Sequence, residues 1–93
     1  MYSVLYTQLA EKELKKLDGE TRRFILAWIG KNLEGCENPR QFGKAVSENR
    51  KGQWRYRLGD YRILAEIIED EIVILILTVG HRREIYIKND QSE

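Results

Sequence analysis

This sequence has one cysteine, one histidine and no group of cysteine, histidine or acidic residues at the spacing of metal ligands. A lone cysteine, Cys36, cannot form a disulfide within the chain, which is typical of a protein in the reducing cytosol. With His81 as the only histidine, neither a metal-dependent mechanism nor a bound cofactor is expected. The apolar run 72–79 is too short to cross a bilayer and no signal peptide precedes it, so we expect a cytoplasmic protein.

The charged residues are unevenly distributed along the chain. The net charge of +1 hides two basic clusters, because five of the Lys and Arg residues fall within 50–62 and three within 81–88. Such clusters predict a local positive surface. Arg50, Lys51 and Lys88 are therefore candidates for contacts with phosphate or RNA.

Hydrophobic periodicity predicts a single α+β domain spanning residues 1–93. The expected elements, in chain order, are a strand over 2–6, a helix over about 8–17, a second helix over about 20–34, a loop over 35–53, a hairpin over 54–68, a central strand over 72–79 and a short last strand within 81–87. Thr7 and Asp18 are the expected N-caps, and Leu9 and Phe24 belong to apolar stripes expected to face the core. The order β-α-α-β-β-β favours an antiparallel-rich sheet of about four to five strands, with the N-terminal helical hairpin packed on it.

The hairpin at 54–68 is the most informative part of the sequence. Apolar residues alternate with arginines before the Gly59-Asp60 turn, which is the period-2 pattern of a half-buried strand. A two-residue loop would place Arg57 opposite Arg62, with Arg55 on the same face. Like charges directly opposite each other destabilise a sheet, so this face is expected to hold an anion, and the planar guanidinium suits phosphate oxygens.

Two motifs at this spacing, WRYRLGDYRILAEI and VGHRREIY, resemble the RelE branch of the RelE/ParE toxin superfamily. The resemblance implies a microbial-RNase-like RelE fold and the toxin of a type II toxin–antitoxin module. It further implies cleavage of messenger RNA in the ribosomal A site and silencing by a cognate, RelB-like antitoxin. The catalytic residues that the matching motif positions imply are Arg55, Arg57, Arg62, Arg82 and Tyr86.

The chemistry that such residues support is RNA cleavage without a metal. The ribose 2′-hydroxyl attacks the adjacent phosphorus, and guanidinium groups stabilise the negative charge that develops on the phosphoryl oxygens. Arginine is protonated at any working pH and is therefore a poor general base. His81 could titrate near neutrality, Tyr86 could relay a proton or stack on a base, and Arg83 competes with Arg82 for the catalytic position, so these roles stay open.

Three other interpretations compete with the nuclease. A ParE-like inhibitor of DNA gyrase would share the fold but lack the catalytic basic residues. A nucleic-acid-binding module without catalysis would use the same positive surface. Arginines on an exposed strand can also be a solvated face paired with acids, and Glu66 lies on the expected face to serve as such a partner.

Overall fold

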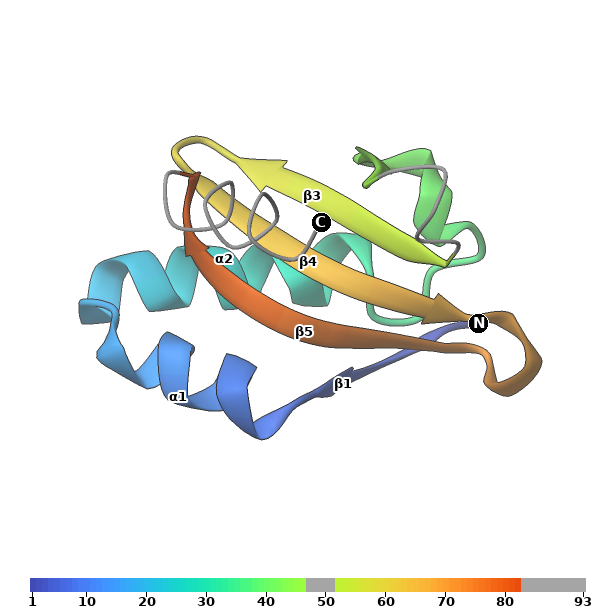
Figure 1. The fold of residues 1–93 in the computed structure, drawn as a ribbon, viewed down its shortest axis with the longest axis horizontal. Helices are drawn as coiled ribbons and strands as arrows, with labels where there is room; N and C mark the ends of the chain where they lie inside the picture. Colours follow the sequence, from blue (N-terminus) through green and yellow to red (C-terminus); the bar gives the residue numbers. More distant parts are fainter. Residues whose placement is uncertain (47–51, 83–93) are drawn as a thin grey trace.

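The computed structural model describes residues 1–46 and 52–82 of the chain (Figure 1). The helices are α1 (Gln8–Lys16) and α2 (Gly19–Asn32), and the strands are β1 (Ser3–Tyr6), β2 (Lys44–Ala45), β3 (Gln53–Leu58), β4 (Tyr61–Ile68) and β5 (Val73–His81). Two short 3-10 helices, η1 (Pro39–Gln41) and η2 (Glu69–Glu71), complete the described elements. None of the helices in these ranges is long and apolar enough to cross a lipid bilayer.

The five strands form one sheet in the order β1-β5-β4-β3-β2. The pairing of β1 with β5 is parallel, and every other pairing is antiparallel. Both helices lie on the same face of this sheet, behind it in the view of Figure 1. The predicted α+β fold, with its helical hairpin on an antiparallel-rich sheet, is confirmed, and β5 is an inner strand as its apolar sequence predicted.

The N-cap of each helix is the residue that the sequence predicted, although α2 begins at Gly19, one residue before the predicted start. The Thr7 side chain accepts a hydrogen bond from the Ala10 backbone N–H at 3.0 Å, and Asp18 accepts one from the Thr21 N–H at 3.1 Å. Both interactions satisfy donors that a helix N-terminus leaves without an intrahelical partner. The Thr21 hydroxyl also donates to the Asp18 carboxylate, and this bond lowers the pKa of Asp18.

The hydrophobic core lies between the helices and strands β3, β4 and β5. Its buried members are Ala10, Leu14, Ile25, Ile29, Leu33, Tyr56, Leu58, Ile63, Ala65, Ile74, Ile76 and Val79. The prediction that Leu9 and Phe24 face this core is wrong, since they are 51% and 57% exposed. In α1 the buried residues Ala10 and Leu14, four positions apart, define the side of the helix that faces the core. Leu9 comes one position before Ala10, so its side chain points about 100° away from that side, toward solvent.

The segment between α2 and β3 is more ordered than its predicted loop. The Tyr56 hydroxyl donates to the Pro39 carbonyl at 2.7 Å, and the Phe42 ring packs edge-on against Trp28 with centroids 5.7 Å apart. The chain then adds β2 to the outer side of β3, with Lys44 opposite Arg55. The prediction of a loop over 35–53 missed this strand because its two residues carry no alternating pattern.

A side chain of α1 supports the C-terminal end of β5, where β1 no longer pairs with it. The Glu13 carboxylate accepts hydrogen bonds from the Thr78 hydroxyl at 2.6 Å and from the Val79 N–H at 2.9 Å. On the same stretch the Thr7 hydroxyl donates to the Leu77 carbonyl at 2.8 Å. These bonds satisfy backbone groups at an exposed strand edge, and they fix the strand that leads to His81 and the residues after it.

Candidate active site on the arginine-bearing face of the sheet

The β3–β4 hairpin has the register that the sequence predicted. Gly59 and Asp60 form a two-residue loop, and Arg57 lies directly opposite Arg62. Gly59 has a φ of +57°, as the first central residue of a type II′ turn requires, and glycine adopts that conformation without the steric cost of a Cβ. Residues on alternate positions therefore point to opposite faces, and the arginines share the face that turns away from the helices.

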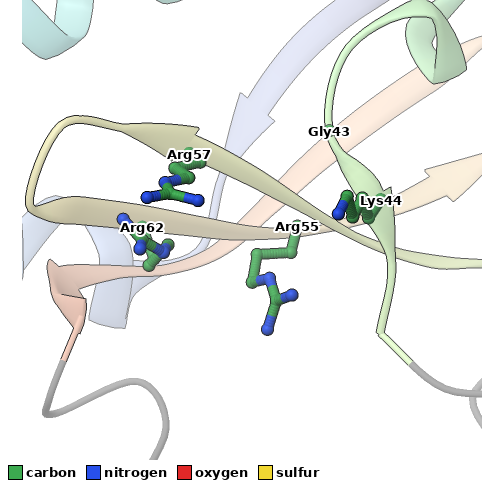
Figure 2. A pocket seen from close by; sticks show the side chains of 5 residues that line it. All are labelled: Gly43, Lys44, Arg55, Arg57 and Arg62. Atoms are coloured by element: carbon green, nitrogen blue, oxygen red, sulfur yellow. The ribbon is translucent and has the colours of Figure 1, made fainter.

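Basic residues line a cavity on this arginine-bearing face. The cavity has a volume of about 190 Å³ and is lined by Gly43, Lys44, Arg55, Arg57 and Arg62. Figure 2 shows the guanidinium groups of Arg57 and Arg62 next to each other, with Arg55 beside them and Lys44 at the other end. Within residues 1–46 and 52–82, the side chains of this lining are all basic. Four positive charges around one concave surface attract anions and concentrate the local field.

The three arginines are held to different degrees. Arg62 is buried, with 2% of its surface exposed, and its Nη1 donates to the Gly59 carbonyl at 2.8 Å and to the Tyr61 carbonyl at 3.0 Å. These bonds fix the guanidinium against the turn. Arg55 is partly buried and Arg57 is exposed. The site thus combines one fixed and buried cation, Arg62, with one exposed cation, Arg57.

Glu66 does not neutralise this face in the way one alternative interpretation supposed. It lies opposite Gln53 and next to the arginines in the register. Within residues 1–46 and 52–82, however, Glu66 forms no ion pair; the only ion pair in these ranges joins Arg40 to Glu69 at 3.3 Å. Within the described residues, Glu66 therefore does not neutralise the arginines of this face.

His81 and Arg82 follow the hairpin tip on the neighbouring strand but do not line the cavity. The His81 ring packs edge-on against Tyr61 with centroids 5.8 Å apart. Tyr61 packs against the core, so this contact places the imidazole on the helix side of the hairpin, away from the cavity. The Arg82 backbone N–H donates to the Asp60 carbonyl at 2.8 Å, which brings that residue to the hairpin tip.

The remaining candidates lie outside the described residues: Arg50, Lys51, Arg83, Tyr86 and Lys88. Their assignments stay predictions from the sequence. Among the residues that the structure describes, no group of three or more histidine, cysteine or acidic side chains could hold a metal ion.

Sequence reasoning missed Lys44 as a member of the site. An isolated lysine in a polar segment gives no signal of its own, because its position depends on the pairing of β2 with β3. Gly43 permits that pairing: its φ is +78°, and a Cβ there would clash with the Arg55 carbonyl oxygen. The sequence signal for this position was therefore a glycine followed by a lysine. It indicates a site residue only when β3 is known to be the strand that pairs with it.

The arrangement of a small sheet with two helices on one face is the fold of solved RelE toxins. The isolated RelE toxin of E. coli has the same fold, with a TM-score of 0.70 over 99% of this chain and 98% of that chain at 21% identity. A chain of the RelBE2 toxin–antitoxin complex from Mycobacterium tuberculosis superimposes with a TM-score of 0.77 at 28% identity, over 87% of this chain and 91% of that chain.

The sequence gives the same classification. Residues 4–86 match the family described as the ParE toxin of the type II toxin–antitoxin system parDE, and the chain belongs to this family. It is also 29% identical over 85 residues to toxin RelG of Mycobacterium tuberculosis, an alignment that covers 91% of this chain and 95% of that protein. The chain is therefore a type II toxin of the RelE/ParE superfamily, as the two motifs implied.

Proposed function

We propose that this toxin is a ribosome-dependent endoribonuclease that cleaves messenger RNA without a metal and so inhibits translation in the cytoplasm. The observation that carries the proposal is the cavity itself, which is lined, among the described residues, by three arginines, a lysine and a glycine. Such a lining suits a substrate whose backbone carries a negative charge at every nucleotide. It suits even better a transition state in which further charge gathers on one phosphate.

In the proposed reaction the ribose 2′-hydroxyl attacks the adjacent phosphorus, and the bond to the 5′-oxygen of the next nucleotide breaks. Arg62 is fixed by its bonds to the turn carbonyls, so it stabilises the developing phosphoryl charge with little reorganisation. Arg57 and Arg55 bind the same backbone from the neighbouring strand. We assign Arg82 a further phosphate contact and Tyr86 the orientation of the hydroxyl or a proton transfer, on the basis of their motif positions.

The lining of the cavity also supports dependence on the ribosome. Arginine and lysine side chains are protonated at neutral pH and cannot accept the proton of the 2′-hydroxyl efficiently. His81 lies on the other side of the hairpin, so we assign it a positioning role. A site with a weak base needs its substrate placed in the reactive geometry by something else, and decoding of messenger RNA in the ribosomal A site would supply that placement.

A cognate antitoxin is the expected partner. Several similar structures are complexes of RelE with RelB, among them an archaeal complex from Pyrococcus horikoshii at 28% identity. We infer an antitoxin segment that is acidic, partly disordered when free, and folded on binding. Neutralising the basic cavity would block phosphate binding directly.

Inhibition of DNA gyrase is the second candidate, because the matching family is described by the parDE system. Such an inhibitor would act through protein contacts and would have no need for four cations around one cavity. The two candidates therefore differ in whether the cavity arginines are required for toxicity.

The decisive experiment maps messenger RNA 5′ ends in a reconstituted translation reaction. We expect new ends on ribosome-bound messages and none on naked RNA. Replacing Arg57, Arg62 or Arg82 by alanine should lower the cleavage rate roughly 10²- to 10³-fold, whereas Lys31→Gln, an exposed lysine at the end of α2, should not change it. Growth arrest with intact messages and gyrase-dependent DNA breaks would support the second candidate instead.

A further inference from the structure

Strand β5 contains one residue more than β4 over the stretch in which the two strands pair. The neighbours Leu64 and Ala65 of β4 pair with residues of β5 that are two positions apart, which leaves Leu77 without a partner in β4. An extra residue of this kind is a β-bulge, which bends the strand and interrupts the ladder of backbone hydrogen bonds. Accordingly, β5 bends toward the turn that joins β3 and β4 (Figure 1).

The bulge reverses the faces to which the last residues of β5 point. Before the bulge Ile76 is buried in the core on the helix side, and after it Val79 is the core residue. Because side chains alternate along a strand, the extra residue moves the helix-facing positions from even to odd numbers. His81 therefore points to the helix side, and Gly80 lies opposite Arg62 on the arginine-bearing face. An unbroken strand would exchange these two directions.

Helix α1 and its N-cap hold the bulged stretch in place. Strand β1 pairs with β5 only up to the residue before the bulge, and from there on Thr7 and Glu13 supply hydrogen bonds. The Thr7 hydroxyl donates to the Leu77 carbonyl at 2.8 Å. The Glu13 Oε1 accepts from the Thr78 hydroxyl at 2.6 Å and from the Val79 N–H at 2.9 Å. One oxygen atom of Glu13 therefore binds two successive residues immediately after the bulge.

The stretch that Glu13 holds leads directly to Arg82, three positions beyond Val79. The Arg82 backbone N–H donates to the Asp60 carbonyl at 2.8 Å, and this bond attaches the end of β5 to the hairpin tip. We propose that Glu13 is a positioning residue: by fixing the bulge in β5, it holds Arg82 at the hairpin tip, where Arg82 acts in cleavage. The proposal rests on the proposed function only for the part that Arg82 plays in cleavage.

Two substitutions of Glu13 separate the acceptor oxygen from the rest of the side chain. Glu13→Gln keeps a carbonyl oxygen that can accept both hydrogen bonds, whereas Glu13→Met keeps the length of the side chain and removes the acceptor. Glu11→Met is the matched control, because Glu11 is an exposed glutamate of the same helix. If the bonds to β5 are what matters, only Glu13→Met should change the position of Arg82.

The first measurement is NMR relaxation of the backbone amides in the full chain, at a temperature where every variant is folded. In Glu13→Met the order parameter of the Arg82 amide should fall from about 0.85, typical of rigid backbone, to below about 0.6. It should keep the wild-type value in Glu13→Gln and in Glu11→Met. The order parameter of folded molecules does not report global stability, so an unchanged Arg82 amide in Glu13→Met would overturn the proposal.

The second measurement is cleavage of messenger RNA on programmed ribosomes by the same variants. Glu13→Met should lower the maximal rate roughly 10- to 100-fold and change the half-saturating toxin concentration at most about twofold, because small displacements of a catalytic group are costly. In an Arg82→Ala background, Glu13→Met should have no further effect on the rate, since it acts through Arg82. Full activity of Glu13→Met, an equal loss in Glu13→Gln, or the same loss without Arg82 would each overturn the proposal.

The two measurements together distinguish a failure of this inference from a failure of the nuclease. If the wild type leaves ribosome-bound messages intact but Arg82 loses order only in Glu13→Met, the nuclease is rejected and the positioning of Arg82 by Glu13 stands. If the wild type cleaves, and Glu13→Met neither slows cleavage nor loosens the Arg82 amide, the nuclease stands and Glu13 has no part in positioning.

Discussion

On the helix side of the β3–β4 hairpin, Tyr56, Ile63 and Ala65 are fully buried against the helices. On the other side of the same strands, Arg55 and Arg57 line a cavity whose side chains, among the described residues, are all basic. Strand alternation separates the two faces residue by residue. One face therefore supplies the free energy of folding through buried apolar area, whereas the other places Arg57 directly opposite Arg62 and Lys44 opposite Arg55.

Arg62 lines the cavity and also stabilises the fold. Its guanidinium lies at the cavity, yet its surface is almost entirely buried and its Nη1 bonds hold the turn together. The comparison of the two faces thus predicts a graded series of effects: large losses of stability from the helix face, an intermediate loss at Arg62, and no loss or a small gain at Arg57.

The largest effect is expected for Ile63→Ala on the helix face. Ile63 is completely buried between strands and helices, and removal of such a side chain leaves a cavity that costs about 2–5 kcal/mol in the free energy of unfolding. Urea denaturation followed by circular dichroism measures this loss. Leu9→Ala is the control, because Leu9 is 51% exposed and its removal should change stability by less than about 0.5 kcal/mol.

RNA cleavage per folded molecule should remain near the wild-type level in Ile63→Ala. An equal loss of activity and stability would mean that the two faces are not separable, and that packing beneath the hairpin sets the geometry of the arginines.

An intermediate effect is expected at Arg62. Replacing it by methionine keeps the length of the side chain but removes two hydrogen bonds from a charged donor, worth about 1.5–3 kcal/mol of stability. The same replacement at Arg57, directly across the hairpin, should leave the free energy of unfolding almost unchanged. Both variants should lose cleavage. Equal stability of the two variants would show that the bonds from Arg62 to the turn contribute nothing to folding.

These contrasts also show what the sequence could reveal. Alternation and the Gly59-Asp60 turn determined the register, and with it the meeting of Arg55, Arg57 and Arg62 on one face. Thr7 and Asp18 marked the helix starts because capping depends on local residue chemistry. Such features involve neighbours in the chain or across one tight turn.

Features that depend on distant packing were not predictable in the same way. Lys44 enters the site only because Gly43, Phe42 and Trp54 dock an edge strand on β3. The parallel pairing of β1 with β5 joins residues about 70 positions apart, for instance Ser3 with Val73. Family resemblance identified the toxin class, but it did not identify this fourth cation.

A smaller loss of stability is expected for Tyr56→Phe. Tyr56 is buried on the helix face, and its hydroxyl bonds the segment that leads to the cavity. Its hydroxyl donates to the Pro39 carbonyl, in the segment that leads to Gly43 and Lys44. Removal of this bond should cost about 1 kcal/mol in the free energy of unfolding. If stability is unchanged, the bond does not hold the segment.

The same variant should alter the pH dependence of stability. Burial raises the pKa of the Tyr56 phenol in the folded protein. As the pH rises past the ordinary tyrosine pKa of about 10, the unfolded chain releases a proton that the folded chain retains, so the wild type loses stability with increasing pH. Tyr56→Phe should lose less over the same alkaline range, as measured by melting temperature.

The smallest effect is expected for Arg57→Gln, and it tests the cavity face directly. Arg57 and Arg62 lie opposite each other, and like charges so placed repel at a cost of up to roughly 1 kcal/mol. Removing one charge should therefore leave the protein as stable, or slightly more stable, at low ionic strength. The difference should shrink as salt screens the repulsion, while nuclease activity falls sharply.

Sulfate distinguishes an anion site from simple repulsion. Because it binds the folded cavity, added sulfate should raise the melting temperature of the wild type more than that of Arg57→Gln, and Lys31→Gln should respond like the wild type. A drop in stability of more than about 1 kcal/mol in Arg57→Gln would instead make Arg57 a structural ion-pair partner, because it would exceed what an exposed charge without such a role contributes. The cavity face would then stabilise the fold as the helix face does, and the contrast between the two faces would not hold.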